Sequence, residues 1–140
     1  MRFSGKIYKN GKFWLAEIPI LDVMTQGYSR KEAFKMVGDL IETMADKEGF
    51  HVSVYSNRQE YFEIGSEDTR TLVSILLQRK RELSGLSLAQ VAKKIGTSSR
   101  NAFARYERGK SIPSVEKLNE LLRAVSPKQD IVLKESTFLQ

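Results

Sequence analysis

The side chains best suited to chemistry lie in one short polar stretch near Gly96 and Gly109. It carries hydroxyl, guanidinium, amide and ammonium groups, and the residues concerned are Ser98, Ser99, Arg100, Asn101, Arg105 and Lys110. Serine and lysine bind phosphate oxygens, whereas arginine fits the edge of guanine and asparagine fits the edge of adenine. The stretch therefore has the side chains of a surface that binds and reads DNA.

Two helices must position these groups, and the sequence around them predicts both. The spacing Ser87-Leu88-Ala89-Gln90 is that of a capping box, which predicts a helix over 87–95. Gly96 then makes a turn, and a second helix follows over 99–108, with Ala102, Phe103 and Tyr106 on its inner side. The N-terminal turn of that second helix is expected to enter the major groove, and backbone amides at its start and at Ser87 to hold phosphates.

Further helices are expected on either side of this pair. Apolar residues recur at helical spacing over 69–83 and 114–125, and Arg81 lies in the last turn of the first of these. Residues Asp130 to Lys134 have the composition of a strand, which we expect to pair with a second copy of the chain across a two-fold axis. A symmetric dimer would present two reading helices to a palindromic operator.

The sequence between residues 69 and 126 resembles the Cro and phage-repressor type of helix-turn-helix. The segments that carry the resemblance are Gly85-Leu86-Ser87 through Ala92, Ile95-Gly96, Tyr106-Glu107-Arg108-Gly109-Lys110 and Pro113-Ser114. The resemblance implies a structural ion pair between Arg81 and Glu107. The sequence departs from this type at two places. Leu88 stands where many relatives have a glutamine, and the turn over Thr97 to Asn101 is one residue longer than is usual in the family. The alternative is a repressor-like fold that serves dimerisation without binding DNA.

The first half of the chain is predicted to be a small sheet with one packed helix. Strand-like runs over 2–8 and 12–18 flank Asn10-Gly11, which predicts a β-hairpin with a type I′ turn. Val23 to Gly27 is a further strand or an extended link. Ser29-Arg30-Lys31-Glu32 has capping-box spacing and starts a helix that Gly49 ends. Two more strands are expected at 51–55 and 60–64, so the overall fold class is α+β.

Part of this half resembles the N-terminal domain of HicB antitoxins. The resemblance rests on Gly11, Phe13 and Ala16-Glu17-Ile18-Pro19, followed by Gln26-Gly27-Tyr28-Ser29 and Glu32-Ala33. It implies a partner, a small basic HicA-like ribonuclease toxin. The acidic residues that we expect to face such a partner are Glu17, Asp22, Glu60 and Glu63. The alternative is that these carboxylates are only solvated surface groups.

Charge is divided unevenly along the chain. Residues 1–65 hold nine Lys and Arg against nine Asp and Glu, whereas residues 66–140 hold fourteen against eight, so the net charge of +6 comes from the second half. We therefore expect a neutral toxin-binding domain over 1–65, a basic DNA-binding domain over 66–126 and a C-terminal strand or tail over 127–140.

Several functional classes are disfavoured by composition. The chain has no cysteine and a single histidine, His51, so no thiolate zinc site or histidine cluster is expected, and neither is a cofactor. Small sheet-and-helix modules of this kind are likened to a degenerate ribonuclease-H fold, in which catalysis would need clustered carboxylates to hold magnesium. The spacing of Asp22, Asp39, Glu42 and Asp46 does not indicate such a cluster. No signal segment or membrane span is evident, which predicts a cytoplasmic protein. The expected function is that of an antitoxin that represses its own operon; the alternative is a stand-alone repressor.

Overall fold

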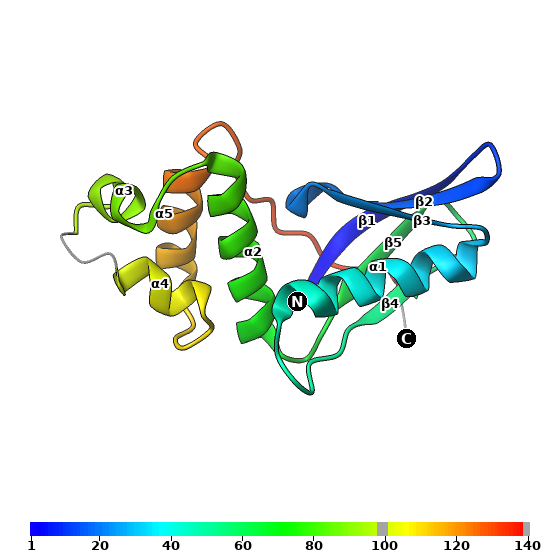
Figure 1. The fold of residues 1–140 in the computed structure, drawn as a ribbon, viewed down its shortest axis with the longest axis horizontal. Helices are drawn as coiled ribbons and strands as arrows, with labels where there is room; N and C mark the ends of the chain where they lie inside the picture. Colours follow the sequence, from blue (N-terminus) through cyan, green and yellow to red (C-terminus); the bar gives the residue numbers. More distant parts are fainter. Residues whose placement is uncertain (98–100, 139–140) are drawn as a thin grey trace. The chain divides into compact units, whose positions relative to one another are not determined.

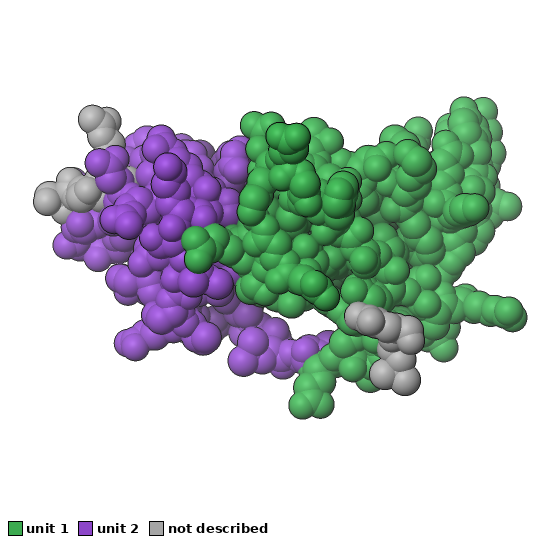
Figure 2. Space-filling view, turned by 90° about the horizontal axis from the view of Figure 1, so that it is seen from below, with its two compact units in different colours: residues 1–72, 135–140 green, residues 73–134 purple. Residues whose placement is uncertain are grey.

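The computed structural model describes residues 1–97 and 101–138, and it is an α+β protein, as predicted (Figure 1). The chain divides into two compact units, which Figure 2 distinguishes by colour. Unit 1 comprises Met1–Leu72 together with Glu135–Gln140, and unit 2 comprises Val73–Lys134. The boundary falls inside a helix, seven residues after the division between 1–65 and 66–126 that was expected from charge.

Unit 1 is built on a five-stranded antiparallel sheet in the order β3-β2-β1-β5-β4. Its strands are β1 (Arg2–Asn10), β2 (Phe13–Ile18), β3 (Val23–Gly27), β4 (Ser53–Ser56) and β5 (Tyr61–Gly65), and a short 3-10 helix, η1 (Pro19–Leu21), precedes β3. The predicted hairpin forms, but the type I′ turn is wrong. Asn10 pairs with Phe13, so the loop residues are Gly11 and Lys12, and only Gly11 has a positive φ.

Helix α1 (Arg30–Ala45) covers one face of the sheet (Figure 1). It starts as predicted, since the Ser29 hydroxyl accepts a hydrogen bond from the Glu32 amide at 3.0 Å. It ends earlier than predicted, because Asp46 already takes up the left-handed conformation, at φ 46°, that Gly49 was expected to provide. The side chains that fill the core between helix and sheet include Ile7, Ala16, Ile18, Val37, Ile41, Phe62 and Ile64.

Every second side chain of each strand points to the face of the sheet that α1 does not cover. Phe62 packs edge-on against Phe34 of α1, with ring centroids 5.3 Å apart, so Glu63 next to it points away from the helix. The register places Lys6, Glu17 and Met24 on that same face, and the exposed fraction of Met24 is 56%. We call this side of unit 1 the open face.

In the part of the chain that the structure describes, four helices follow: α2 (Thr69–Ser84), α3 (Leu88–Lys94), α4 (Asn101–Glu107) and α5 (Val115–Val125). Helices α3, α4 and α5 lie within the predicted ranges 87–95, 99–108 and 114–125, and α2 extends one residue beyond the predicted 69–83. The predicted strand over Asp130 to Lys134 is wrong for the single chain, since no regular structure is assigned over 128–138. A strand needs a hydrogen-bonded neighbour, and Val132 and Leu133 stand 84% and 89% exposed instead.

Candidate nucleic-acid interface

Helix α3 is held at both ends by local signals in its sequence. The capping box forms in full: the Ser87 hydroxyl accepts from the Gln90 amide at 3.1 Å, and the Gln90 side chain accepts from the Ser87 amide at 2.8 Å. At the other end Gly96 lies at φ 80°, while Thr97 donates its amide to the Ala92 carbonyl at 3.0 Å. This Schellman geometry turns the chain sharply after α3.

Helix α4 separates a buried side from an exposed side. Phe103 and Ala104 are 0% and 4% exposed, whereas Asn101 and Arg105, four residues apart, are both exposed and lie on one stripe. Of the predicted inner residues, Phe103 is fully buried, Ala102 and Tyr106 are half-buried, and Ala104 was missed. The exposed stripe therefore bears the two side chains that are suited to adenine and guanine edges.

The end of α4 repeats the device that ends α3. Gly109 lies at φ 70°, and the Lys110 amide donates to the Arg105 carbonyl at 2.9 Å. Lys110 is exposed at this turn. Its ammonium group is thus carried on a fixed backbone next to the stripe, where a phosphate contact is sterically open.

An ion pair fixes α4 against α2, as the resemblance implied. Arg81 Nε lies 2.8 Å from Glu107 Oε2, and Arg81 Nη2 lies 2.7 Å from Glu107 Oε1, which is a two-point contact. Arg81 Nη1 also donates to the Leu86 carbonyl at 3.1 Å. The carboxylate raises the pKa of the Arg81 guanidinium above its ordinary value, chiefly through these hydrogen bonds. The pair is structural, since it holds α4 while leaving its outer stripe clear.

Some of the predicted DNA-binding residues are engaged in the fold or lie outside the described part. The Ser87 amide and hydroxyl are both used in the capping box, so a phosphate bound there would have to share them. Ser98, Ser99 and Arg100 lie outside the described residues. Asn101, Arg105 and Lys110 are exposed on unit 2, and so is Ser87, although its polar atoms take part in the capping box.

Sequence reasoning missed a hollow beside α4. It measures about 440 Å³, and the polar side chains that line it are Thr97, Arg105, Tyr106, Ser111 and Lys117. Arg105 Nη2 lies 3.5 Å from Ser111 Oγ, so the guanidinium extends along this hollow. The sequence signal at this point is the helix start at Ser114, whose hydroxyl accepts from the Lys117 amide. That cap places Lys117 in the first turn of α5, but the cap alone does not show that the Lys117 side chain lies at this hollow. Arg105 thus places its charge at this hollow, whereas the Lys117 ammonium group is paired with Glu120 at 3.0 Å.

Residues 77–125 match the protein family described as Helix-turn-helix. This segment is a DNA-binding helix-turn-helix domain. It contains α3, the turn at Gly96, α4 and α5, and the Arg81–Glu107 ion pair lies within it. No curated protein matches the chain in a sequence search.

The four acidic residues predicted to face a partner have different surroundings in unit 1. Glu17 is half-buried on the open face, and Asp22 and Glu60 are exposed. Glu63 is only 5% exposed, because its carboxylate is hydrogen-bonded to Arg2 and to Ser136. The sequence thus placed Glu63 correctly on a strand, yet gave no sign that its own chain would cover it.

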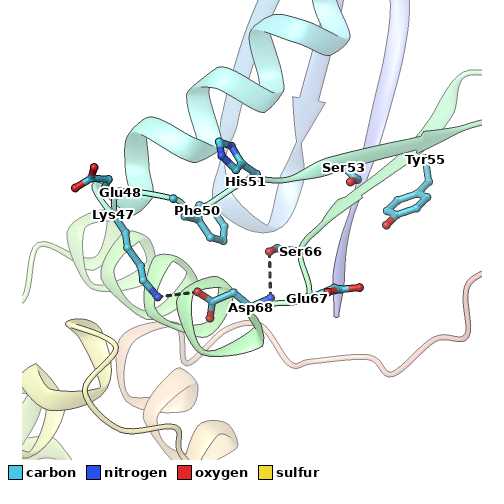
Figure 3. Close-up of a pocket in the computed structure, with 10 residues that line it drawn as sticks. Lys47, Glu48, Phe50, His51, Ser53, Tyr55, Ser66, Glu67 and Asp68 are labelled. Carbon is cyan, nitrogen blue, oxygen red and sulfur yellow. Dashed lines mark hydrogen bonds and ion pairs between the residues drawn. The ribbon is translucent and has the colours of Figure 1, made fainter.

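Unit 1 also contains a hollow of about 660 Å³ (Figure 3). Two of its charged groups pair: Lys47 Nζ lies 2.8 Å from Asp68 Oδ2, and Thr71 Oγ1 donates to the same oxygen at 2.6 Å. These hydrogen bonds, that of Lys47 foremost, lower the pKa of Asp68 to about 2. The Asp68 carboxylate also accepts from the Thr71 amide, so its role is to cap α2.

Two of the four carboxylates considered for metal catalysis, Asp39 and Glu42, have structural partners. Asp39 pairs with Lys35, and Glu42 accepts from the Val52 amide at 3.0 Å. Among residues 1–97 and 101–138, no group of three or more His, Asp or Glu side chains is placed to hold a metal ion. In the same ranges no helix combines the length and the apolar character needed to cross a bilayer.

Proposed function

We propose that this protein is a sequence-specific transcriptional regulator that represses its own operon. The observation that carries the proposal is the exposed stripe of Asn101 and Arg105 on a helix-turn-helix whose back is anchored by Phe103. Base reading is assigned to Arg100, Asn101 and Arg105, and phosphate contacts to Ser87, Ser98, Ser99 and Lys110. The net charge of the second half favours a polyanionic partner.

Repression by this domain is proposed to require a homodimer. One short helix such as α4 offers few base contacts, and a two-fold pair doubles them on a palindromic site. The exposed apolar residues Val132 and Leu133 support the proposal, since they follow α5 and have the composition to pair with the same segment of a second copy.

Unit 1 is proposed to make the regulator an antitoxin that neutralises a HicA-like messenger-RNA-cleaving toxin. Support comes from the HicB-like order of features: the hairpin forms β1 and β2, Gln26-Gly27 ends β3, and the capped helix is α1. The contacts proposed are Glu17, Asp22 and Glu60, with Glu63 available only after its own chain releases it. Both roles place the protein in the cytoplasm.

A stand-alone repressor is the second candidate. The burial of Glu63 favours it, because one of the four expected partner contacts is already occupied within unit 1. The antitoxin and the stand-alone repressor are distinguished by expressing any short reading frame that lies next to the gene. Growth arrest that this protein relieves, while also retarding its own promoter DNA, supports the antitoxin. Promoter binding without any toxic neighbour leaves a repressor, and absence of promoter binding contradicts both.

A further inference from the structure

The open face of the sheet is exposed over most of its area but closed at one end. Met24 and Tyr61 on this face are 56% and 48% exposed, whereas Glu63 is 5% exposed. The helix α1 lies on the other face, so it cannot bury Glu63. Another segment of unit 1 must therefore cover this end.

That segment is the C-terminal stretch Glu135–Phe138, which belongs to unit 1. Ser136 Oγ donates to Glu63 Oε1, and Arg2 Nη1 lies 3.0 Å from each of three acceptors, Glu63 Oε1, Ser136 Oγ and the Phe138 carbonyl. The Arg2 guanidinium is in turn seated 3.5 Å above the centre of the Tyr55 ring. One arginine thus links the sheet to the end of the chain.

The contact is polar and shallow. Glu135, Ser136 and Thr137 are all exposed, and only Phe138 is half-buried, so little apolar area holds this stretch in place. Its hydrogen bonds with Arg2 and Glu63 are part-buried or exposed, so water competes for the same groups. The residues that lead to it, 127–134, are exposed as well. A stretch held in this way can be released without unfolding the sheet.

We propose that Glu135–Phe138 is a releasable strap, docked in cis on the Arg2, Tyr55 and Glu63 end of the open face. When docked, it returns the chain from unit 2 to unit 1 and so adds a second connection to the one that runs through α2. The strap restricts the motion of the DNA-binding unit, and any protein that covers this end of the open face must first displace it. This holds whether or not the protein is an antitoxin.

The test compares full-length Ser136→Leu with the matched control Thr137→Val, in the same exposed segment. Leucine removes the hydroxyl that bridges Arg2 and Glu63, whereas position 137 takes no part in the bridge described above. Backbone ¹⁵N relaxation should show residues 135–138 as ordered as β5 in the wild type and in Thr137→Val, with loss of that order in Ser136→Leu. A strap that is already mobile in the wild type, or still ordered in Ser136→Leu, would overturn the proposal.

Two further measurements test whether the strap forms a second connection between the two units and whether it docks on its own copy of the chain. The chain has no cysteine, so cysteines introduced at Lys31 and Asn119, both exposed, can carry spin labels specifically. The distance distribution between them should broaden in Ser136→Leu but not in Thr137→Val, and equal widths would overturn the second connection. A label at position 137 that broadens the β5 signals of another, ¹⁵N-labelled copy more strongly than those of its own copy would place the strap in trans and overturn the cis docking.

Discussion

Arg81 and Glu107 join the last turn of α2 to the end of α4 through two short hydrogen bonds, with 22% and 10% of their side-chain areas exposed. The pair lies behind the stripe of Asn101 and Arg105, and Ser74 reinforces it by donating to the Glu107 carbonyl at 2.5 Å. The position of the proposed reading stripe therefore depends on an ion pair that is not itself part of the stripe.

Loss of the Glu107 carboxylate should destabilise unit 2. In Glu107→Ala the partly buried Arg81 keeps its charge without its main partner, which we expect to cost about 2 kcal/mol. Urea unfolding followed by far-ultraviolet circular dichroism measures the change. The matched control is Arg123→Ala, which breaks the exposed pair with Asp130 and should cost less than about 0.5 kcal/mol. Equal losses of unfolding free energy in the two variants would contradict the prediction, because they would show that exposure does not decide the strength of these ion pairs.

Acid should weaken the Lys47–Asp68 contact in unit 1. Because Asp68 has its pKa lowered from 3.8 to about 2, its stabilising contribution is complete above pH 4 and is lost as the pH falls towards 2. Asp68→Asn keeps an acceptor for the Thr71 amide but cannot titrate. Thermal unfolding at pH 5, 3 and 2 should therefore show the wild type losing its advantage over Asp68→Asn. A constant difference over this range would contradict the assigned cause.

Two glycines should respond to alanine with opposite signs. Gly96→Ala places a side chain at φ 80° in the turn of the helix-turn-helix, and we expect it to cost about 1 kcal/mol. Gly38→Ala lies inside α1, where the added Cβ would meet only Val52 Cγ2 at 3.7 Å, so helix propensity should stabilise unit 1 by about 0.5–1 kcal/mol. Chemical denaturation of both variants checks the signs, and the same sign for both would disprove the argument.

Sequence reasoning succeeded where a signal and its consequence lie within a few residues of each other. Ser29 with Glu32 and Ser87 with Gln90 specify helix starts through hydrogen bonds three residues apart, and the structure contains both. The positive φ of Gly96 follows from the same kind of local chemistry. Even the Arg81–Glu107 pair, 26 residues apart, was accessible, because a family resemblance supplied the contact.

The failures concern contacts with no local signal. Glu63 was expected on the surface, but Ser136 covers it from 73 positions away, and nothing near Glu63 in the sequence announces this. The strand expected over Asp130 to Lys134 reflects β-propensity alone, which forms no strand without a neighbouring chain to pair with. Ala104 was missed because a small residue in a polar helix reads as neutral, although it packs at 4% exposure.

Lys110 should contribute to affinity without contributing to base preference. Its ammonium group is exposed beside α4, and Lys110→Ala should weaken binding to all DNA sequences similarly and reduce the salt-dependence slope by about one. Fluorescence anisotropy over a range of salt concentrations measures the slope. Lys35→Ala in α1 of unit 1 removes the same charge elsewhere and should leave the slope unchanged. A reduced slope in Lys35→Ala alone would place the phosphate contacts on the other unit.

The most direct test of the account is the binding of full-length protein to its own promoter DNA before and after the reading stripe is removed. The double variant Asn101→Ala, Arg105→Ala should retain its circular dichroism spectrum but lose preference for the promoter over unrelated DNA, by about 1–3 kcal/mol for each side chain. The matched control Asn57→Ala, Arg58→Ala removes the same residue types from the exposed loop between β4 and β5 and should bind like the wild type. Unchanged promoter preference in the stripe variant would contradict the assignment of α4 as the helix that reads DNA.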